Sequence, residues 1–196
     1  MPPLFHFHRA LVIKVFVGVL LLATTCLIGA VAHEAGHVIT AAAFGHPLQR
    51  VDVIPGIQIY PTIRWTGWSA NIAWVAMGTP RVPWQEGLCL LMGSGMTSVL
   101  AYCGLFVAAR LRRNLSRVIL AASVLYAWDM LLYATMPLIG LRHWIVVGGS
   151  FAEPFEGARL MGLADWVFWL LWTTDFLLFH WLLARVYCRG GDSEAI

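Results

Sequence analysis

Charged residues are scarce in this chain of 196 residues: Asp, Glu, Lys and Arg make up 12% of it, whereas hydrophobic residues make up 60%. An ordinary soluble domain is roughly a quarter charged and about half apolar. The shortage of charge excludes a disordered chain and argues against a globule that folds in water. The few basic residues are spread along the sequence and the net charge is only +3, so the composition also argues against a nucleic-acid partner.

Cysteines are few as well, and no two of them form a C-x-x-C pair. The four are Cys26, Cys89, Cys103 and Cys188. Their spacing excludes a disulfide framework and a cysteine zinc site of the usual kind. Because three of them lie inside apolar stretches, we expect free, buried thiols.

Long apolar runs, in contrast, are abundant. A helix rises about 1.5 Å per residue, so about 20 apolar residues cross the roughly 30 Å hydrocarbon core of a bilayer. Four runs reach this length: Leu11–Phe44, Gly87–Ala109, Val118–Leu141 and Trp166–Val186. They predict an all-α polytopic membrane protein with about four to five transmembrane helices, placed in the cell membrane in contact with lipid.

The first run is longer than a bilayer requires, since a straight helix over Leu11–Phe44 would extend about 51 Å. We therefore expect it to tilt, to project from the bilayer or to break, and Gly29 is the predicted break. The arginine-rich segment ARLRRNLSR, residues 109–117, is predicted to be cytoplasmic because short basic loops stay on that side.

One membrane domain is predicted over residues 1–190, followed by a tail at 191–196. Within it, residues 47–86 form an insert of different character. The stretch QRVDVIPGIQIYPTIRW has two β-branched runs around Pro55-Gly56, which is a turn signal between strands. The sequence therefore predicts a small β-hairpin on the membrane surface, directly after the first long helix.

The sequence HEAGH, residues 33–37, carries the clearest chemical signal. On a helix, His33 and His37 lie four residues apart on one face and can bind a single Zn²⁺ through their imidazole nitrogens. Glu34 then lies beside the metal, where it can take a proton from water as a general base. The pattern predicts a zinc hydrolase.

A catalytic zinc needs a third protein ligand, and the residues by themselves leave several acids and one histidine open for this role. These candidates are Glu153, Glu156, Asp129, Asp175 and His180. Asp129 has a second possible role, because a carboxylate often holds the other ring nitrogen of a ligand histidine.

Three segments of the chain resemble the site-2 protease family of intramembrane zinc metalloproteases. HEAGHVITAAAFGHPLQRVDVIPG resembles the metal-binding helix and the β-like segment after it, LLMGSGMTSVL resembles the start of the next span, and FEGARLM resembles the motif whose acid is the third zinc ligand. The resemblance implies that Glu156 is this ligand, with Asp129 as the alternative.

The resemblance also implies an activity: hydrolysis of a peptide bond in a transmembrane protein substrate. Three other functions stay open. The chain could be another membrane zinc hydrolase, such as a prenyl-protein endopeptidase. It could be an inactive relative that binds or regulates membrane partners, or a proton or metal-ion transporter built on the same polar residues.

Overall fold

The computed structural model describes residues 4–53, 56–68, 73–78, 82–145 and 148–192. Helices dominate it, and a small sheet follows the first helix. In chain order the elements are α1 (Leu4–Ala43), β1 (Leu48–Val53), β2 (Ile57–Tyr60), β3 (Arg64–Trp65), β4 (Ala73–Met77), α2 (Pro83–Ala108), α3 (Arg113–Thr135), the 3₁₀ turn η1 (Pro137–Ile139), α4 (Glu153–Leu160) and α5 (Asp165–Asp192).

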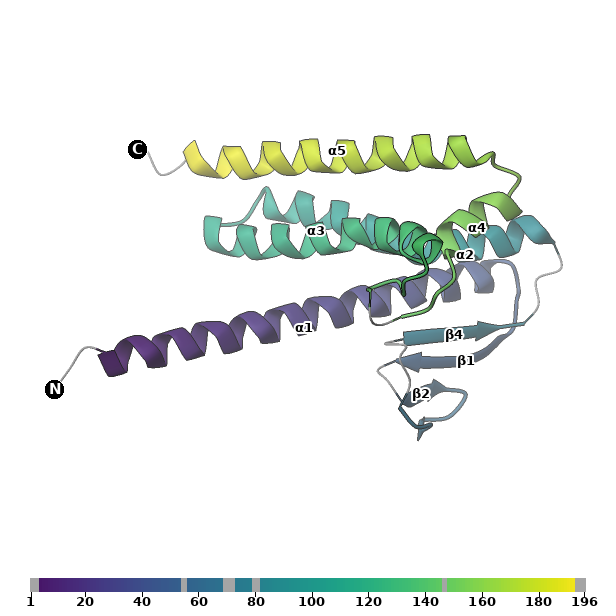
Figure 1. Ribbon diagram of the computed structural model, residues 1–196, viewed down its shortest axis with the longest axis horizontal. Coiled ribbons are helices and arrows are strands. Elements are labelled where there is room, and N and C mark those ends of the chain that lie inside the picture. Colours follow the sequence, from purple (N-terminus) through teal and green to yellow (C-terminus); the bar gives the residue numbers. More distant parts are fainter. Residues whose placement is uncertain (1–3, 54–55, 69–72, 79–81, 146–147, 193–196) are drawn as a thin grey trace.

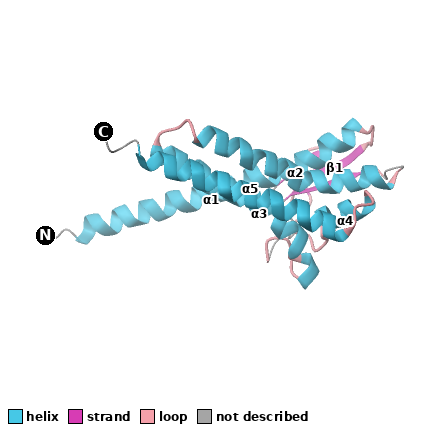
Figure 2. Ribbon diagram, turned by 90° about the horizontal axis from the view of Figure 1, so that it is seen from above, coloured by secondary structure: helices cyan, strands magenta, loops and turns pink. Residues whose placement is uncertain are grey.

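Four of the helices are long and apolar enough to cross a membrane, and they match the four predicted runs. Helices α2, α3 and α5 lie side by side, while the N-terminal half of α1 diverges from them (Figures 1 and 2). The two ends of the chain lie at the same end of the molecule as the α2–α3 connection. The short helix α4 and the sheet lie toward the opposite end (Figure 1).

The predicted break of the first helix at Gly29 is wrong. Helix α1 is continuous over 40 residues, which corresponds to about 60 Å. A Cβ added at Gly29 would lie 3.1 Å from Cε1 of Tyr126 in α3. The glycine therefore allows α3 to approach α1 closely, and the helix extends beyond the bundle instead of breaking.

The predicted hairpin is part of a larger antiparallel sheet. Strands β1 and β2 pair as expected, with Val51 opposite Tyr60; Pro55 of the predicted turn lies outside the described residues. Strands β3 and β4 extend the sheet on its two sides to the order β3-β2-β1-β4. An apolar run as short as that of β4 carries no period that separates strand from helix. Among the described residues β4 pairs only with β1, so no strand is bonded to its other edge.

Two buried clusters of apolar side chains hold the helices together. One buried cluster joins α2, α3 and α5, and a second, which includes Ala134, Ala158 and Phe168, anchors α4 against α3 and α5. A Cβ added at Gly157 of α4 would lie 2.5 Å from the carbonyl oxygen of Gly87 in α2. This close contact fixes the middle of α4 beside the first turns of α2. All four cysteines are free, as expected, although only Cys89 is buried.

Candidate metal centre

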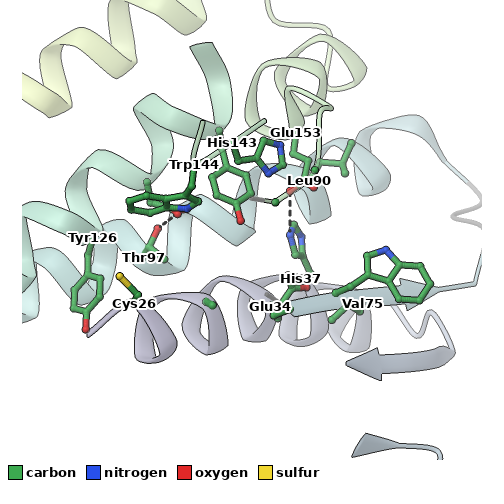
Figure 3. Close-up of a pocket in the computed structure, with 18 of the residues that line it drawn as sticks. Cys26, Glu34, His37, Val75, Leu90, Thr97, Tyr126, His143, Trp144 and Glu153 are labelled. Atoms are coloured by element: carbon green, nitrogen blue, oxygen red, sulfur yellow. Dashed lines mark hydrogen bonds and ion pairs between the residues drawn. The ribbon is translucent and has the colours of Figure 1, made fainter. Parts of the chain in front are cut away.

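His33 and His37 lie one turn apart on α1 and face the interior of the bundle, with 1% and 6% of their surface exposed. Their ring centroids are 4.9 Å apart. The Nε2 atoms of the two rings lie 3.3 Å and 3.4 Å from the same oxygen, Oε2 of Glu153. Figure 3 shows His37 and Glu153 facing one another across the site. One ligand atom from each residue lies within 4.8 Å of the other two, and a metal ion could bind between them.

The other nitrogen of each imidazole is held by a second group. Nδ1 of His33 lies 2.9 Å from Oδ2 of Asp129, which also accepts a hydrogen bond of 2.9 Å from the Thr97 hydroxyl. Nδ1 of His37 donates a hydrogen bond of 2.7 Å to the backbone carbonyl of Cys89. Such outer partners fix the ring orientation and tautomer of histidine ligands in metal sites.

This hydrogen-bonding pattern fits a cation between the three groups. A carbonyl oxygen only accepts, so the proton of a neutral His37 is on Nδ1 and its Nε2 carries a lone pair. That lone pair points at a carboxylate oxygen of Glu153, and the same arrangement recurs at His33 opposite Asp129. Two lone-pair donors and one anion at contact distance repel one another unless a positive charge lies between them.

Glu153 supplies negative charge to the group. Burial by itself would raise the pKa of its carboxyl, but when the two imidazoles are protonated, hydrogen bonds from His33 and His37 lower this pKa well below its ordinary value. The side chain is therefore ionised at neutral pH. The donor set is two imidazoles and one carboxylate, which is a set found in catalytic zinc sites.

The structure replaces Glu156 by Glu153 as the third candidate ligand. Glu156 lies one helical turn further along α4, and its carboxylate instead forms an ion pair of 3.2 Å with Arg159. Glu153 is the first residue of α4 and precedes Pro154. Proline is typical of the first helical turn. Pro154 therefore indicated from the sequence that α4 begins at Glu153, ahead of Glu156.

Asp129 does not join the metal-ligand group but takes the other role considered for it, because its carboxylate holds Nδ1 of His33. Asp175 and His180 lie away from the group. They bond to side chains of α2 and α3 where α5 packs on these helices. Of the five candidates, only Glu153 therefore lies at the Nε2 atoms of the histidines.

Gly93 of α2 makes room for the two imidazoles. A Cβ built on this residue would lie 2.5 Å from Nε2 of His33 and 2.5 Å from Nε2 of His37. Gly36, between the histidines, allows the same close approach, since its Cβ would overlap the carbonyl oxygen of Met92. Any side chain at position 93 would occupy the space in which the metal ligands converge.

We expect Gly93→Ala to abolish metal binding while Gly95→Ala preserves it. The added methyl at position 93 overlaps the Nε2 atoms of both histidines, which are the candidate ligand atoms. At position 95 the nearest atom is the flexible thioether of Met92, at 3.1 Å. Metal content of the two purified variants, measured by elemental analysis, checks this expectation. Equal metal content in both would show that the Nε2 atoms are not ligands.

A cavity of about 510 Å³ opens beside the group and is bounded by α1, α2, α3, α4, β4 and the segment after η1. Glu34 lines it together with His37 and Glu153, and no other described residue hydrogen-bonds the Glu34 carboxylate. Figure 3 shows Glu34 next to His37 on α1, with strand β4 beside them. The carboxylate is therefore free to bind a water molecule or a ligand in the cavity.

A stack of rings borders the cavity on its α3 side. Tyr133 packs on His33, with ring centroids 4.1 Å apart, and on His143, with centroids 3.8 Å apart. Nε2 of His143 donates a hydrogen bond of 2.7 Å to the carbonyl of Phe151. Burial lowers the pKa of His143, so its ring is neutral at pH 7. Sequence reasoning missed Tyr133 and His143, because neither belongs to a recognisable motif.

Comparison of the chain with protein-family models, with curated proteins and with solved structures gives no match. The arrangement of residues at the site is therefore the basis for assigning a function.

Proposed function

We propose that the chain is an intramembrane zinc metalloprotease that hydrolyses a peptide bond of a transmembrane protein substrate. The observation that carries this proposal is the meeting of His33, His37 and Glu153 beside Glu34, among four helices of membrane-spanning length. Three protein ligands leave a fourth zinc position open for water or substrate. The resemblance to site-2 proteases supports the same function. The proposed third ligand, Glu153, lies one helical turn before Glu156, the acid that this resemblance matched.

Each residue has a defined role in this reaction. Bound zinc supplies a Lewis acid that lowers the pKa of water and polarises the scissile carbonyl. Glu34 accepts a proton from the attacking water and passes it to the amide nitrogen, which leaves as an amine when the C–N bond breaks. The products are a carboxylate and an amine. Asp129 and the Cys89 carbonyl keep His33 and His37 in the tautomer that offers Nε2.

Strand β4 provides a way to present the substrate. The backbone of a transmembrane helix is fully hydrogen-bonded, so a peptide bond within it must first unwind. Residues of β4 line the same cavity as Glu34, and no described strand pairs with the outer edge of β4. An unwound segment can add to this edge as a further strand and gain backbone hydrogen bonds. Its scissile bond then lies in the cavity with Glu34.

The distribution of arginines supports an orientation in the membrane. Both ends of the chain and the α2–α3 connection lie at one end of the bundle, and the segment 109–117 carries four arginines. Basic loops stay in the cytoplasm. With four spans, both termini are then cytoplasmic and the metal centre lies nearer the opposite face.

Removal of the metal tests the proposal. The purified protein in detergent is expected to cleave a reporter carrying a single transmembrane helix. A chelator such as 1,10-phenanthroline should stop the cleavage, and added Zn²⁺ should restore it. Cleavage that is insensitive to chelation would contradict the proposal. Bound zinc without cleavage of any transmembrane reporter would favour an inactive binding protein, and ion flux in vesicles without cleavage would favour a transporter.

A further inference from the structure

Hydrolysis of a peptide bond places negative charge on the carbonyl oxygen, and O–H or N–H donors that point at this oxygen accelerate the reaction. This inference rests on the proposed function and concerns such a donor in the cavity that Glu34 lines. Most polar side chains around the cavity are already committed: the Thr25 hydroxyl donates to a carbonyl of its own helix, Thr97 to Asp129, His37 to Cys89, and His143 to Phe151.

Four side-chain donors that line the cavity have no hydrogen bond to another described residue. They are Trp74, Tyr126, Tyr133 and Trp144. Of these, only Tyr133 has a ring contact with a member of the candidate metal group, the imidazole of His33. Its hydroxyl also lies within electrostatic range of the carboxylates of Asp129, Glu153 and Glu34. Tyr133 therefore extends from α3 to the point where the metal ligands and the general base meet.

Packing holds the Tyr133 ring in a fixed position. It lies between His33 on one side and His143 on the other, at centroid distances of 4.1 Å and 3.8 Å. His143 is itself held by its bond to the Phe151 carbonyl and by Gly149, where an added Cβ would lie 3.1 Å from the imidazole. A donor held in place before the reaction costs no reorganisation when charge develops.

We propose that Tyr133 is a catalytic residue whose hydroxyl donates a hydrogen bond to the carbonyl oxygen of the scissile peptide bond as the tetrahedral adduct forms. No covalent bond to Tyr133 is made or broken, and the phenol keeps its proton throughout. The hydroxyl acts on the developing oxyanion, while Glu34 handles the proton of the attacking water.

Tyr133→Phe tests this role because it keeps the ring stack and removes only the hydroxyl. Loss of one oxyanion donor typically lowers kcat by about 10²–10³-fold. We expect this loss with KM and zinc content unchanged, and a parallel loss of affinity for a phosphinic peptide, which mimics the tetrahedral adduct. Tyr102→Phe is the matched control: it removes a phenol hydroxyl that bonds Asp175 outside the cavity, and it should leave kcat and phosphinate affinity as in the wild type.

Each outcome separates this inference from the proposed function. A wild type that cleaves and a Tyr133→Phe variant with the same kcat would overturn the role of Tyr133 alone. A variant that loses zinc, or one in which only KM rises, would also overturn it, because the residue would then position a ligand or bind substrate without acting on the oxyanion. A zinc-loaded wild type that cleaves nothing would overturn the proposed function and this inference together.

Discussion

Glu153→Ala is expected to reduce bound zinc from about one ion per chain to nearly none, because it removes one of the three proposed ligands and, among the described residues, the only acid at the two Nε2 atoms. Two imidazoles alone bind zinc more weakly than three ligands do, so the variant is expected to lose the metal during dialysis against metal-free buffer. Elemental analysis of the purified, dialysed variants gives the measurement.

Two other acids provide controls for this loss. Glu156→Ala breaks only the ion pair with Arg159 and should retain the metal. Asp129→Asn disturbs the partner of His33 and should weaken zinc binding by about 10–100-fold without abolishing it. The assignment is contradicted if Glu156→Ala loses zinc while Glu153→Ala keeps it, since the sequence resemblance would then have identified the correct acid.

Glu34→Gln is expected to lower the rate of cleavage by about 10²–10⁴-fold, the usual contribution of a general base, while the zinc content stays at the wild-type level. The amide has the same shape as the carboxylate but cannot accept the proton of water. Glu34 is not one of the three residues whose ligand atoms converge, so metal binding should not change. The measurement pairs kcat on the transmembrane reporter with zinc content.

Glu86→Gln is a matched control for this variant, because Glu86 is an exposed acid in the first turn of α2, outside the cavity. It should cleave at the wild-type rate. Full activity in Glu34→Gln would remove Glu34 as the base. Loss of zinc in that variant would show instead that Glu34 is a ligand.

The helices could be predicted from the sequence because each long apolar run is a local property of the chain. The features that were predicted wrongly or missed depend on contacts between segments that are distant in the sequence. Gly29 looks like a break in isolation, but in the fold it faces the ring of Tyr126. Strand β4 could not be found by period, since it gains its conformation from pairing with β1, with Val51 opposite Val75.

The candidate site likewise has one part that the local sequence predicts and one part that depends on distant contacts. The spacing of His33, Glu34 and His37 on one helix places them together whatever the rest of the chain does. The third candidate ligand is 120 residues away from His33, and two acids one helical turn apart compete for the position. Only the docking of α4 on α2, through the glycine contact at positions 87 and 157, selects Glu153. The hydrogen bond from His37 to the backbone carbonyl of Cys89 could not be predicted from the sequence, because every residue type has such a carbonyl.

Zinc-edge X-ray absorption of the purified protein reports both whether a metal is bound and which atoms bind it. We expect two imidazole nitrogens at about 2.0–2.1 Å and a carboxylate oxygen at about 2.0–2.2 Å from the zinc, with the carboxylate signal lost in Glu153→Ala. Protein that binds no zinc, or a zinc ion without histidine ligands, would contradict the proposed metal centre.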